Sequence, residues 1–258
     1  MNEPRIDSLF STPVYSVIRD SELNLEESEE IKSIIEEGLR TNKGNKTTIN
    51  SYIFETKLKK IKEFCEQEIK RYVEIVISPL QELEFYITES WINVTKPGEF
   101  HHVHYHPNSI ISGVFYVNTV QEDQINFTDP NYKVKGRLDF GQKEYNLWNS
   151  AQWWIPVVNN QLTLFPSWLE HDVKHIKGDK ERISISFNTF VRGNLGDNEL
   201  NNLIYYRKDN MESYDMCTQI IYEMSDRHKW MGLFMFGFGL FVGVVFQKIQ
   251  DGEIERTP

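Results

Sequence analysis

Cysteine is scarce in this chain of 258 residues, which contains only Cys65 and Cys217. The two lie far apart and form no CxxC pair. This spacing argues against a disulfide framework and against a cysteine-ligated zinc site. A reducing compartment fits a chain of this kind.

Clustered basic residues are also lacking. Lys and Arg together number 28 against 38 Asp and Glu, which gives a formal charge of −10. The basic stretches at 57–62 and 174–180 are short and are typical of solvated faces. Because nucleic-acid binding needs grouped Lys and Arg for the phosphates, we expect no nucleic-acid partner.

The first 20 residues have no apolar run, so the sequence predicts no secretory signal. One long apolar run occurs, at 230–246, and it contains no charged residue. A helix of this length spans roughly 25 Å, somewhat less than the hydrocarbon core of about 30 Å but within the accepted range. We therefore predict one membrane anchor at 230–247. Gly239 and Gly243 could pair two such helices in a homodimer. A buried hairpin or a dimerisation helix is the alternative, because glycines weaken the helix propensity of the run and its length is near the lower limit for a span.

Two amphipathic helices are predicted before a β-rich stretch. Apolar residues recur at helical spacing from Leu23 to Leu39 and from Leu58 to Val76, and the polar segment 41–50 between them is typical of a loop. Phe10 to Tyr15 predicts a short edge strand, because Pro13 cannot donate a ladder hydrogen bond. Further strands are expected at 85–94, 110–119, 137–140, 153–158, 161–165 and 182–191. This order predicts a mainly β, α+β chain whose helices pack on one sheet of a sandwich or jelly roll.

Histidines gather in one short segment. Because residues two apart on a strand point to the same side, His104 and His106 could direct both imidazoles at one metal. A third ligand from a distant strand, such as His171, would complete a face with open positions, which suits a catalytic metal. The alternative is a solvated loop of histidines after Pro97 and Gly98. The chain's histidines outside the C-terminal region are His101, His102, His104, His106, His171 and His175.

Two blocks of sequence around these histidines resemble a known family. The first block comprises 91–98 and 104–117, and the second comprises 164–171 and 181–188. They resemble a family of 2-oxoglutarate/Fe(II) oxygenases that are distant relatives of the prolyl hydroxylases. The similarity covers roughly residues 8–192. It implies a double-stranded β-helix with N-terminal packing helices, a bound Fe(II) and 2-oxoglutarate as cosubstrate.

Site residues follow from this resemblance position by position. His171 corresponds to the distal iron ligand of the family, and Arg182 to the residue that pairs with the far carboxylate of 2-oxoglutarate. A guanidinium matches a carboxylate bidentately and keeps its proton. Ser184 completes the Arg-x-Ser motif. Tyr116 occupies a position from which some relatives bind the cosubstrate, although a core tyrosine is an equal alternative. Polar residues expected to line the same pocket are Asn93, Ser112 and Asn188.

One departure concerns the carboxylate ligand of the family. The sequence contains no His-x-Asp or His-x-Glu. In His104-Tyr-His106 the second histidine would take the carboxylate's place, which leaves the metal more electrophilic. A pair formed by His102 and His104, or a contribution from Asp172, are the open alternatives.

The resemblance implies a dioxygenase that hydroxylates a small-molecule or peptidyl substrate and releases succinate and CO2. Its cofactors would be Fe(II) and 2-oxoglutarate, with ascorbate as a further candidate. Two other functions stay open: a cupin-type dioxygenase or isomerase without 2-oxoglutarate, and a non-catalytic metal- or ligand-binding jelly roll. Arg182 is the residue expected to discriminate, because its placement would have no purpose without 2-oxoglutarate.

The domain boundaries follow from these patterns. We expect the oxygenase domain at 1–195, in the cytoplasm where Fe(II) and 2-oxoglutarate are available. A polar, weakly helical linker at 196–229, the anchor at 230–247 and a short tail at 248–258 complete the chain.

Overall fold

The computed structural model describes residues 4–132, 141–196 and 204–206. All of them lie in the unit Met1–Arg207, which is compact on its own. The elements described below belong to this unit.

Eight strands form the larger of two antiparallel sheets. Seven follow the order β1-β9-β6-β11-β4-β3-β2, and β12 pairs with β11 outside this path. The two longest strands, β4 and β11, pair along nearly their whole length, from Arg182 opposite Thr95 to Gly193 opposite Leu83. The bounds are β1 Tyr15–Ile18, β2 Leu39–Thr41, β3 Lys46–Thr48, β4 Leu83–Thr95, β6 Ile111–Asn118, β9 Gln161–Pro166, β11 Arg182–Leu195 and β12 Ile204–Tyr206.

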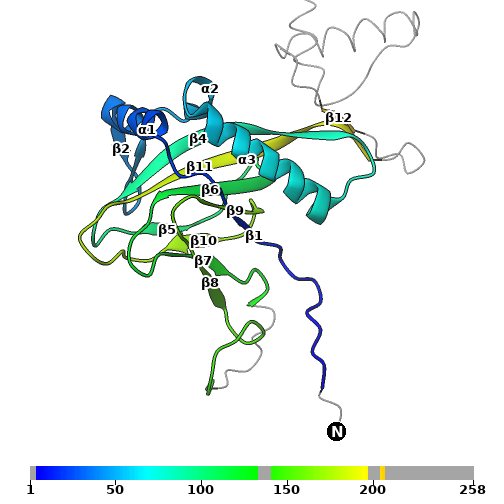
Figure 1. Cartoon of the computed structure of the whole chain (residues 1–258). Coiled ribbons are helices and arrows are strands. Elements are labelled where there is room, and N and C mark those ends of the chain that lie inside the picture. The colour runs from blue at the N-terminus through cyan, green and yellow to red at the C-terminus, as the bar shows by residue number, and fades with distance from the viewer. Residues whose placement is uncertain (1–3, 133–140, 197–203, 207–258) are drawn as a thin grey trace, which may run out of the picture. The chain divides into compact units, whose positions relative to one another are not determined.

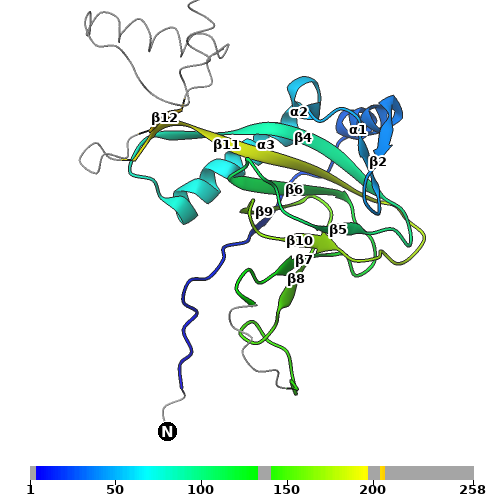
Figure 2. The ribbon, with the colours of Figure 1, turned by 180° about the vertical axis from the view of Figure 1, so that it is seen from behind.

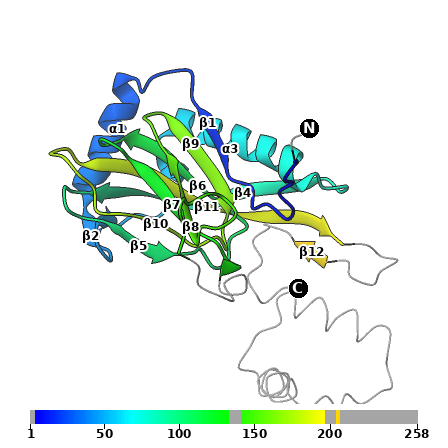
Figure 3. The same cartoon turned by 90° about the horizontal axis from the view of Figure 1, so that it is seen from below.

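Four strands form the smaller sheet, in the order β5-β10-β7-β8. Figures 1 and 2 show this sheet below the larger one, and Figure 3 shows its strands across the face of β6 and β11. The bounds are β5 His101–His104, β7 Gln124–Thr128, β8 Gln152–Pro156 and β10 His171–Val173.

The helices cover the opposite face of the larger sheet (Figure 1). Helix α1 begins with a capping box, in which Asn24 accepts from the Glu27 amide and the Glu27 carboxylate accepts from the Asn24 amide. Apolar residues of α1 and α3, such as Ile34 and Ile61, pack with sheet residues such as Phe115 in one core cluster. The bounds are α1 Leu25–Glu37, α2 Ile53–Thr56, α3 Lys59–Tyr72 and a π-helical turn η1 Val73–Ile77.

The alternation of side chains along β11 separates two environments. Ile183, Ile185 and Phe187 pack with the helix-side core. Arg182 and Ser184 point to the other face, toward the smaller sheet. A second cluster fills part of the space between the sheets, with Tyr116, Phe127 and Phe165 among its members. The protein is thus mainly antiparallel β with few helices, an arrangement consistent with a jelly roll.

Most of the predicted elements are confirmed. Both long helices form, and the five strands predicted at 85–94, 110–119, 153–158, 161–165 and 182–191 correspond to β4, β6, β8, β9 and β11. The strand predicted at 137–140 lies outside the described residues.

Three differences concern short elements. Segment 41–50 is not wholly a loop, because β2 and β3 form a hairpin whose second strand pairs with β4. Gly44, with a φ of 95°, lies in the turn of that hairpin. The N-terminal edge strand begins only at Tyr15, after Pro13. Strand β12 lies within the segment expected to be a weakly helical linker.

The prediction of a membrane-spanning helix is corrected. Among the described residues no helix is long and apolar enough to cross a membrane. The longest, α3, has 14 residues and is amphipathic, whereas a membrane span needs about 20 predominantly apolar residues. The run 230–246, on which the prediction depended, lies outside the described residues.

Candidate metal centre

Two histidines meet on neighbouring strands of the smaller sheet. His104 ends β5 and His171 begins β10, and the register of the two strands places these residues opposite each other. His106 follows β5, where its backbone N–H donates to the Ser167 carbonyl at 2.9 Å. This bond brings the segment after β5 to the segment before β10. His171 therefore shares one place with His104 and His106, which lie about 65 residues earlier in the sequence.

The three side chains converge and form what we call the histidine triad: His104, His106 and His171. One ring nitrogen from each lies within 4.8 Å of the others. The ring centroids of His104 and His171 are 4.3 Å apart, and those of His106 and His171 are 5.2 Å apart. Three imidazole nitrogens at such separations could hold one metal ion.

Hydrogen bonds to backbone carbonyls fix the tautomers of two triad members. The Nδ1 of His104 lies 2.7 Å from the His102 carbonyl, and the Nδ1 of His171 lies 2.9 Å from the Leu169 carbonyl. Because a carbonyl can only accept, each Nδ1 carries the hydrogen and each Nε2 keeps its lone pair. Metal-binding histidines are commonly oriented in this way.

Burial keeps these imidazoles neutral. It lowers the pKa of His171 well below its ordinary value of 6.5 and also lowers the pKa of His104. For His106, burial and then the neighbouring His104 lower the pKa to about 3. Neutral imidazole is the form that binds metal, so the triad needs no deprotonation near pH 7.

A second group, His101, His102 and His104, also has nitrogens within 4.8 Å of one another. However, the Asn42 amide nitrogen lies 3.2 Å from Nε2 of His101. The orientation of this amide is set by its oxygen, which accepts from the Lys43 N–H at 2.8 Å. Nε2 of His101 therefore accepts, and its Nδ1 must carry the hydrogen in the neutral ring. This tautomer leaves His101 without a free lone pair, so the triad is the better metal site.

Asp172 lies next to the triad in sequence, but its carboxylate has another partner. One oxygen accepts from Lys174 at 2.7 Å. Consecutive residues of a strand point to opposite faces, so His171 and Asp172 of β10 face different sides of the smaller sheet. This arrangement does not favour Asp172 as a ligand beside His171.

Aromatic rings from the larger sheet border the triad. The Trp91 ring lies 5.8 Å from that of His106, and the Phe165 ring lies 4.6 Å from that of His171. Trp91 belongs to β4 and Phe165 to β9. The triad therefore faces the space between the two sheets, and apolar surfaces restrict water on that side.

Arg182 is buried, with its side chain 3% exposed, and forms an ion pair with the fully buried Asp123. Nε of Arg182 lies 2.9 Å from both carboxylate oxygens of Asp123. Nη1 of Arg182 donates to the Ser184 hydroxyl at 3.3 Å. Arg182 therefore has a purpose within the protein itself, contrary to the expectation that only 2-oxoglutarate would explain it.

Tyr116 lies on β6 directly opposite Ser184 of β11. The guanidinium carbon of Arg182 is 5.1 Å from the centroid of the Tyr116 ring. The Tyr116 side chain is fully buried, and its hydroxyl has no hydrogen-bond partner among the described residues. Burial raises the pKa of Tyr116 to about 12, so the hydroxyl stays protonated and can donate. Arg182, Ser184 and Tyr116, which the sequence pointed to, thus lie together.

Residues 89–188 match the sequence model of a family described as "Putative 2OG-Fe(II) oxygenase". The matched segment includes the histidine triad, Arg182, Ser184 and Tyr116. Residues 89–188 therefore resemble a 2OG-Fe(II) oxygenase domain. No curated protein matches the chain.

Solved structures of three proteins are similar to part of this chain. A prolyl-4-hydroxylase of Pseudomonas putida is 15% identical, with a TM-score of 0.49 over 72% of this chain and 96% of that chain. A viral collagen prolyl hydroxylase of Paramecium Bursaria Chlorella virus-1, in its 2OG complex, is 12% identical, with a TM-score of 0.44 over 68% and 94%. HygX of Streptomyces hygroscopicus, with nickel, 2-oxoglutarate and hygromycin B bound, is 9% identical, with a TM-score of 0.46 over 69% and 82%. Similarity at this level indicates nothing about the substrate.

The residues of the matched segment fit both groups that the family name implies. Three convergent neutral imidazoles suit a divalent transition metal. The unpartnered Tyr116 hydroxyl beside a buried guanidinium suits a carboxylate, because both groups donate to anionic oxygens. The triad supplies no negative charge to the metal.

Other polar residues of the matched segment form hydrogen bonds along the middle of β11. The Ser112 hydroxyl donates to Asn188 at 3.0 Å and lies 2.8 Å from the Ser167 hydroxyl. The Asn93 amide donates to Ser186 at 2.9 Å. The sequence had indicated Asn93, Ser112 and Asn188 as pocket-lining residues, and these bonds show that each has a partner within the fold.

Asp123 is the residue of the site that the sequence did not indicate. It lies 59 positions before Arg182 and directly before β7, a strand that was also not predicted. Its neighbours Gln121, Glu122 and Gln124 are polar. No local pattern therefore distinguishes Asp123 from a surface turn residue.

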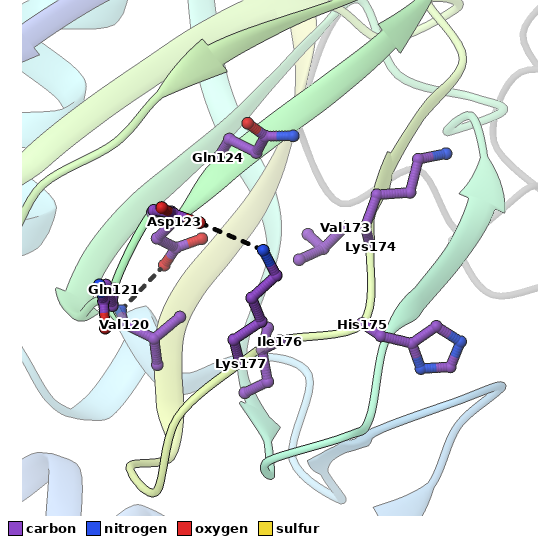
Figure 4. Close-up of a pocket in the computed structure, with 10 residues that line it drawn as sticks. Val120, Gln121, Asp123, Gln124, Val173, Lys174, His175, Ile176 and Lys177 are labelled. Carbon is purple, nitrogen blue, oxygen red and sulfur yellow. Dashed lines mark hydrogen bonds and ion pairs between the residues drawn. The ribbon is translucent and has the colours of Figure 1, made fainter.

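A cavity of about 260 Å³ lies between the start of β7 and the segment that follows β10. Figure 4 shows its lining, with Asp123 on one side and Lys174, His175 and Lys177 on the other. None of the triad histidines lines it. This cavity is therefore distinct from the histidine triad.

Proposed function

We propose that the protein is an Fe(II)- and 2-oxoglutarate-dependent dioxygenase that hydroxylates its substrate. The observation that supports this best is the pairing of two groups in one domain. A triad of neutral imidazoles lies on the smaller sheet, and a buried guanidinium with a free tyrosine hydroxyl lies on the facing side of the larger sheet.

In this proposal His104 and His171 hold the metal through their Nε2 atoms, and His106 holds it through one ring nitrogen. When bound, iron and 2-oxoglutarate supply the oxidising chemistry, with succinate and CO2 as the products of the cosubstrate. The protein orients the groups and restricts water. The carbonyl partners of His104 and His171 fix the ring planes, so little reorganisation is needed on loading.

Arg182 and Tyr116 would bind the far carboxylate of 2-oxoglutarate. The guanidinium supplies charge and a fork of donors, and the Tyr116 hydroxyl supplies one further donor. Ser184 lies two residues further along β11 on the same face, and its hydroxyl accepts a hydrogen bond from Nη1 of Arg182. The double-stranded β-helix that we propose for the domain would bring these residues and the triad to opposite sides of one pocket.

A histidine in place of a carboxylate ligand leaves the iron with a larger positive charge. We infer that this charge favours the ferrous state, and ascorbate is the candidate reductant that would restore Fe(II) after any oxidation. The substrate would be a small molecule or a peptidyl residue that enters near the triad.

Turnover of 2-oxoglutarate tests the proposal. Purified protein with Fe(II), ascorbate and 2-oxoglutarate should form succinate, and formation should increase when a cell extract supplies the substrate. His171→Ala is the control that removes a proposed ligand, and it should abolish succinate formation. Absence of succinate in the wild-type protein under all these conditions would contradict the proposal.

The ion pair between Arg182 and Asp123 favours a second candidate, because it gives Arg182 a structural purpose. In that case the domain would be a metal-binding jelly roll that does not use 2-oxoglutarate. Metal loading without any binding of 2-oxoglutarate would distinguish this candidate from the dioxygenase.

A further inference from the structure

Asp123 makes the principal contact of Arg182 in the structure. Both of its carboxylate oxygens accept from Nε, and the two side chains are 3% and 0% exposed. A buried ion pair contributes little net stability, since removing two charges from water offsets their attraction. The pair is therefore compatible with a role at the site in addition to its structural one.

The contact is made through one edge of the guanidinium. Asp123 engages Nε, Ser184 accepts from Nη1, and the Tyr116 ring lies against the planar face. A guanidinium carries five N–H donors, of which this arrangement uses only part. The outer edge can thus present a fork to a second carboxylate.

Asp123 is itself fixed by the backbone around it. Its N–H donates to the Val120 carbonyl at 3.2 Å, and its carbonyl accepts from the Val157 N–H at 3.1 Å. Its carboxylate also accepts from the Val120 N–H at 3.4 Å, as Figure 4 shows. The turn before β7 therefore sets the position of the carboxylate, and the carboxylate sets that of Arg182.

We propose that Asp123 is a positioning residue that directs the outer edge of Arg182 toward the far carboxylate of 2-oxoglutarate. This inference rests on the proposed function.

The balance of charges at the site supports the positioning role of Asp123. The two positive charges of Fe(II) match the two negative charges of 2-oxoglutarate, and the three imidazole ligands add none. Arg182 would then leave one uncompensated positive charge in a buried site, which is costly, and Asp123 cancels it.

The test measures ligand selectivity, which a general loss of structure would not change. The full chain loaded with Mn(II) is titrated by calorimetry with 2-oxoglutarate and with 2-oxopentanoate, in which a methyl group replaces the far carboxylate. Asp123→Asn should weaken 2-oxoglutarate binding by about tenfold, the size typical of lost support for a ligand-binding group. Binding of 2-oxopentanoate should not change.

The matched control is Glu122→Gln. It alters the net charge by the same amount one residue away, but Glu122 is an exposed partner of Lys177. It should leave both affinities unchanged. Asp123→Glu is the second variant, since it keeps the charge and moves the carboxylate by one methylene. Asp123→Glu should also lower the preference for 2-oxoglutarate over 2-oxopentanoate. If Asp123→Asn does not fold, the Asp123→Glu variant provides the test by itself.

Each outcome is decisive. Loss of the Asp123 charge alone would attract the cosubstrate dianion more strongly, so unchanged or tighter 2-oxoglutarate binding overturns the positioning role. An equal loss for both ligands also overturns it, because that result indicates a structural effect. If the wild-type protein shows no preference for 2-oxoglutarate over 2-oxopentanoate, the proposed function fails as well.

Discussion

Replacement of His106 by glutamine should change how stability depends on pH. Burial and the nearby His104 lower the pKa of His106 from 6.5 to about 3 in the folded protein. In the unfolded chain the imidazole binds a proton below about pH 6.5, whereas the folded protein resists protonation. Because the unfolded state binds more protons, the free energy of unfolding falls as the pH decreases below about 6.5.

The size of this loss of stability follows from the shift in the pKa of His106. Each pH unit between the two pKa values corresponds to about 1.4 kcal/mol. Lowering the pH from 7 to about 5 crosses roughly 1.5 such units, so His106 alone should account for about 2 kcal/mol of lost stability. The glutamine variant has no titrating group at this position and should lose about 2 kcal/mol less than the wild-type protein.

Urea unfolding of metal-free protein at both pH values measures this difference. A chelator keeps the triad free of metal, since bound metal would stabilise the folded state separately. Parallel pH dependences of the wild-type protein and His106→Gln would refute the reasoning. They would mean that His106 is a solvated loop residue and does not pack within the triad.

Three further predictions concern the cosubstrate and the fold. Arg182→Leu should retain Mn(II) but bind 2-oxoglutarate at least about tenfold more weakly, because a hydrogen bond to a charged group contributes about 1.5–3 kcal/mol; equal affinity by calorimetry would contradict this role. Gly113→Ala should lower the free energy of unfolding by about 1–3 kcal/mol, because a Cβ there would overlap the Phe187 ring. An unchanged midpoint of urea unfolding would contradict this prediction and show that the ring can move aside. Asn24→Ala should lower the free energy of unfolding by about 1 kcal/mol through loss of the α1 capping box. An unchanged midpoint in the same urea assay would contradict a stabilising role of this cap.

The sequence predicted the parts of the fold that depend on local pattern. The long helices carry apolar residues at helical spacing, and the long strands alternate, as β11 does from Arg182 to Phe187. The short strands β5, β7 and β10 have three to five residues each. A period of two cannot be recognised over so few positions, and tertiary pairing rather than propensity forms such strands.

The candidate site was predictable to the extent that family motifs mark its residues. His104, His106 and His171 stand out by type and spacing, and Arg182 by its place after the distal histidine. Asp123 could not be found in this way, because its function depends on a contact with a residue 59 positions later. The tautomer of His101 depends likewise on Asn42, in a hairpin that the sequence did not predict.

Metal content of histidine variants tests the central claim most directly. The wild-type protein, loaded with Co(II) or Mn(II) and freed of excess ion, should retain one metal ion per chain by elemental analysis. His104→Ala, His106→Ala and His171→Ala should each lose it, whereas His101→Ala and His102→Ala should keep it. Undiminished metal in His171→Ala would contradict the account, and loss in His102→Ala with retention in His106→Ala would place the metal at the other histidine group.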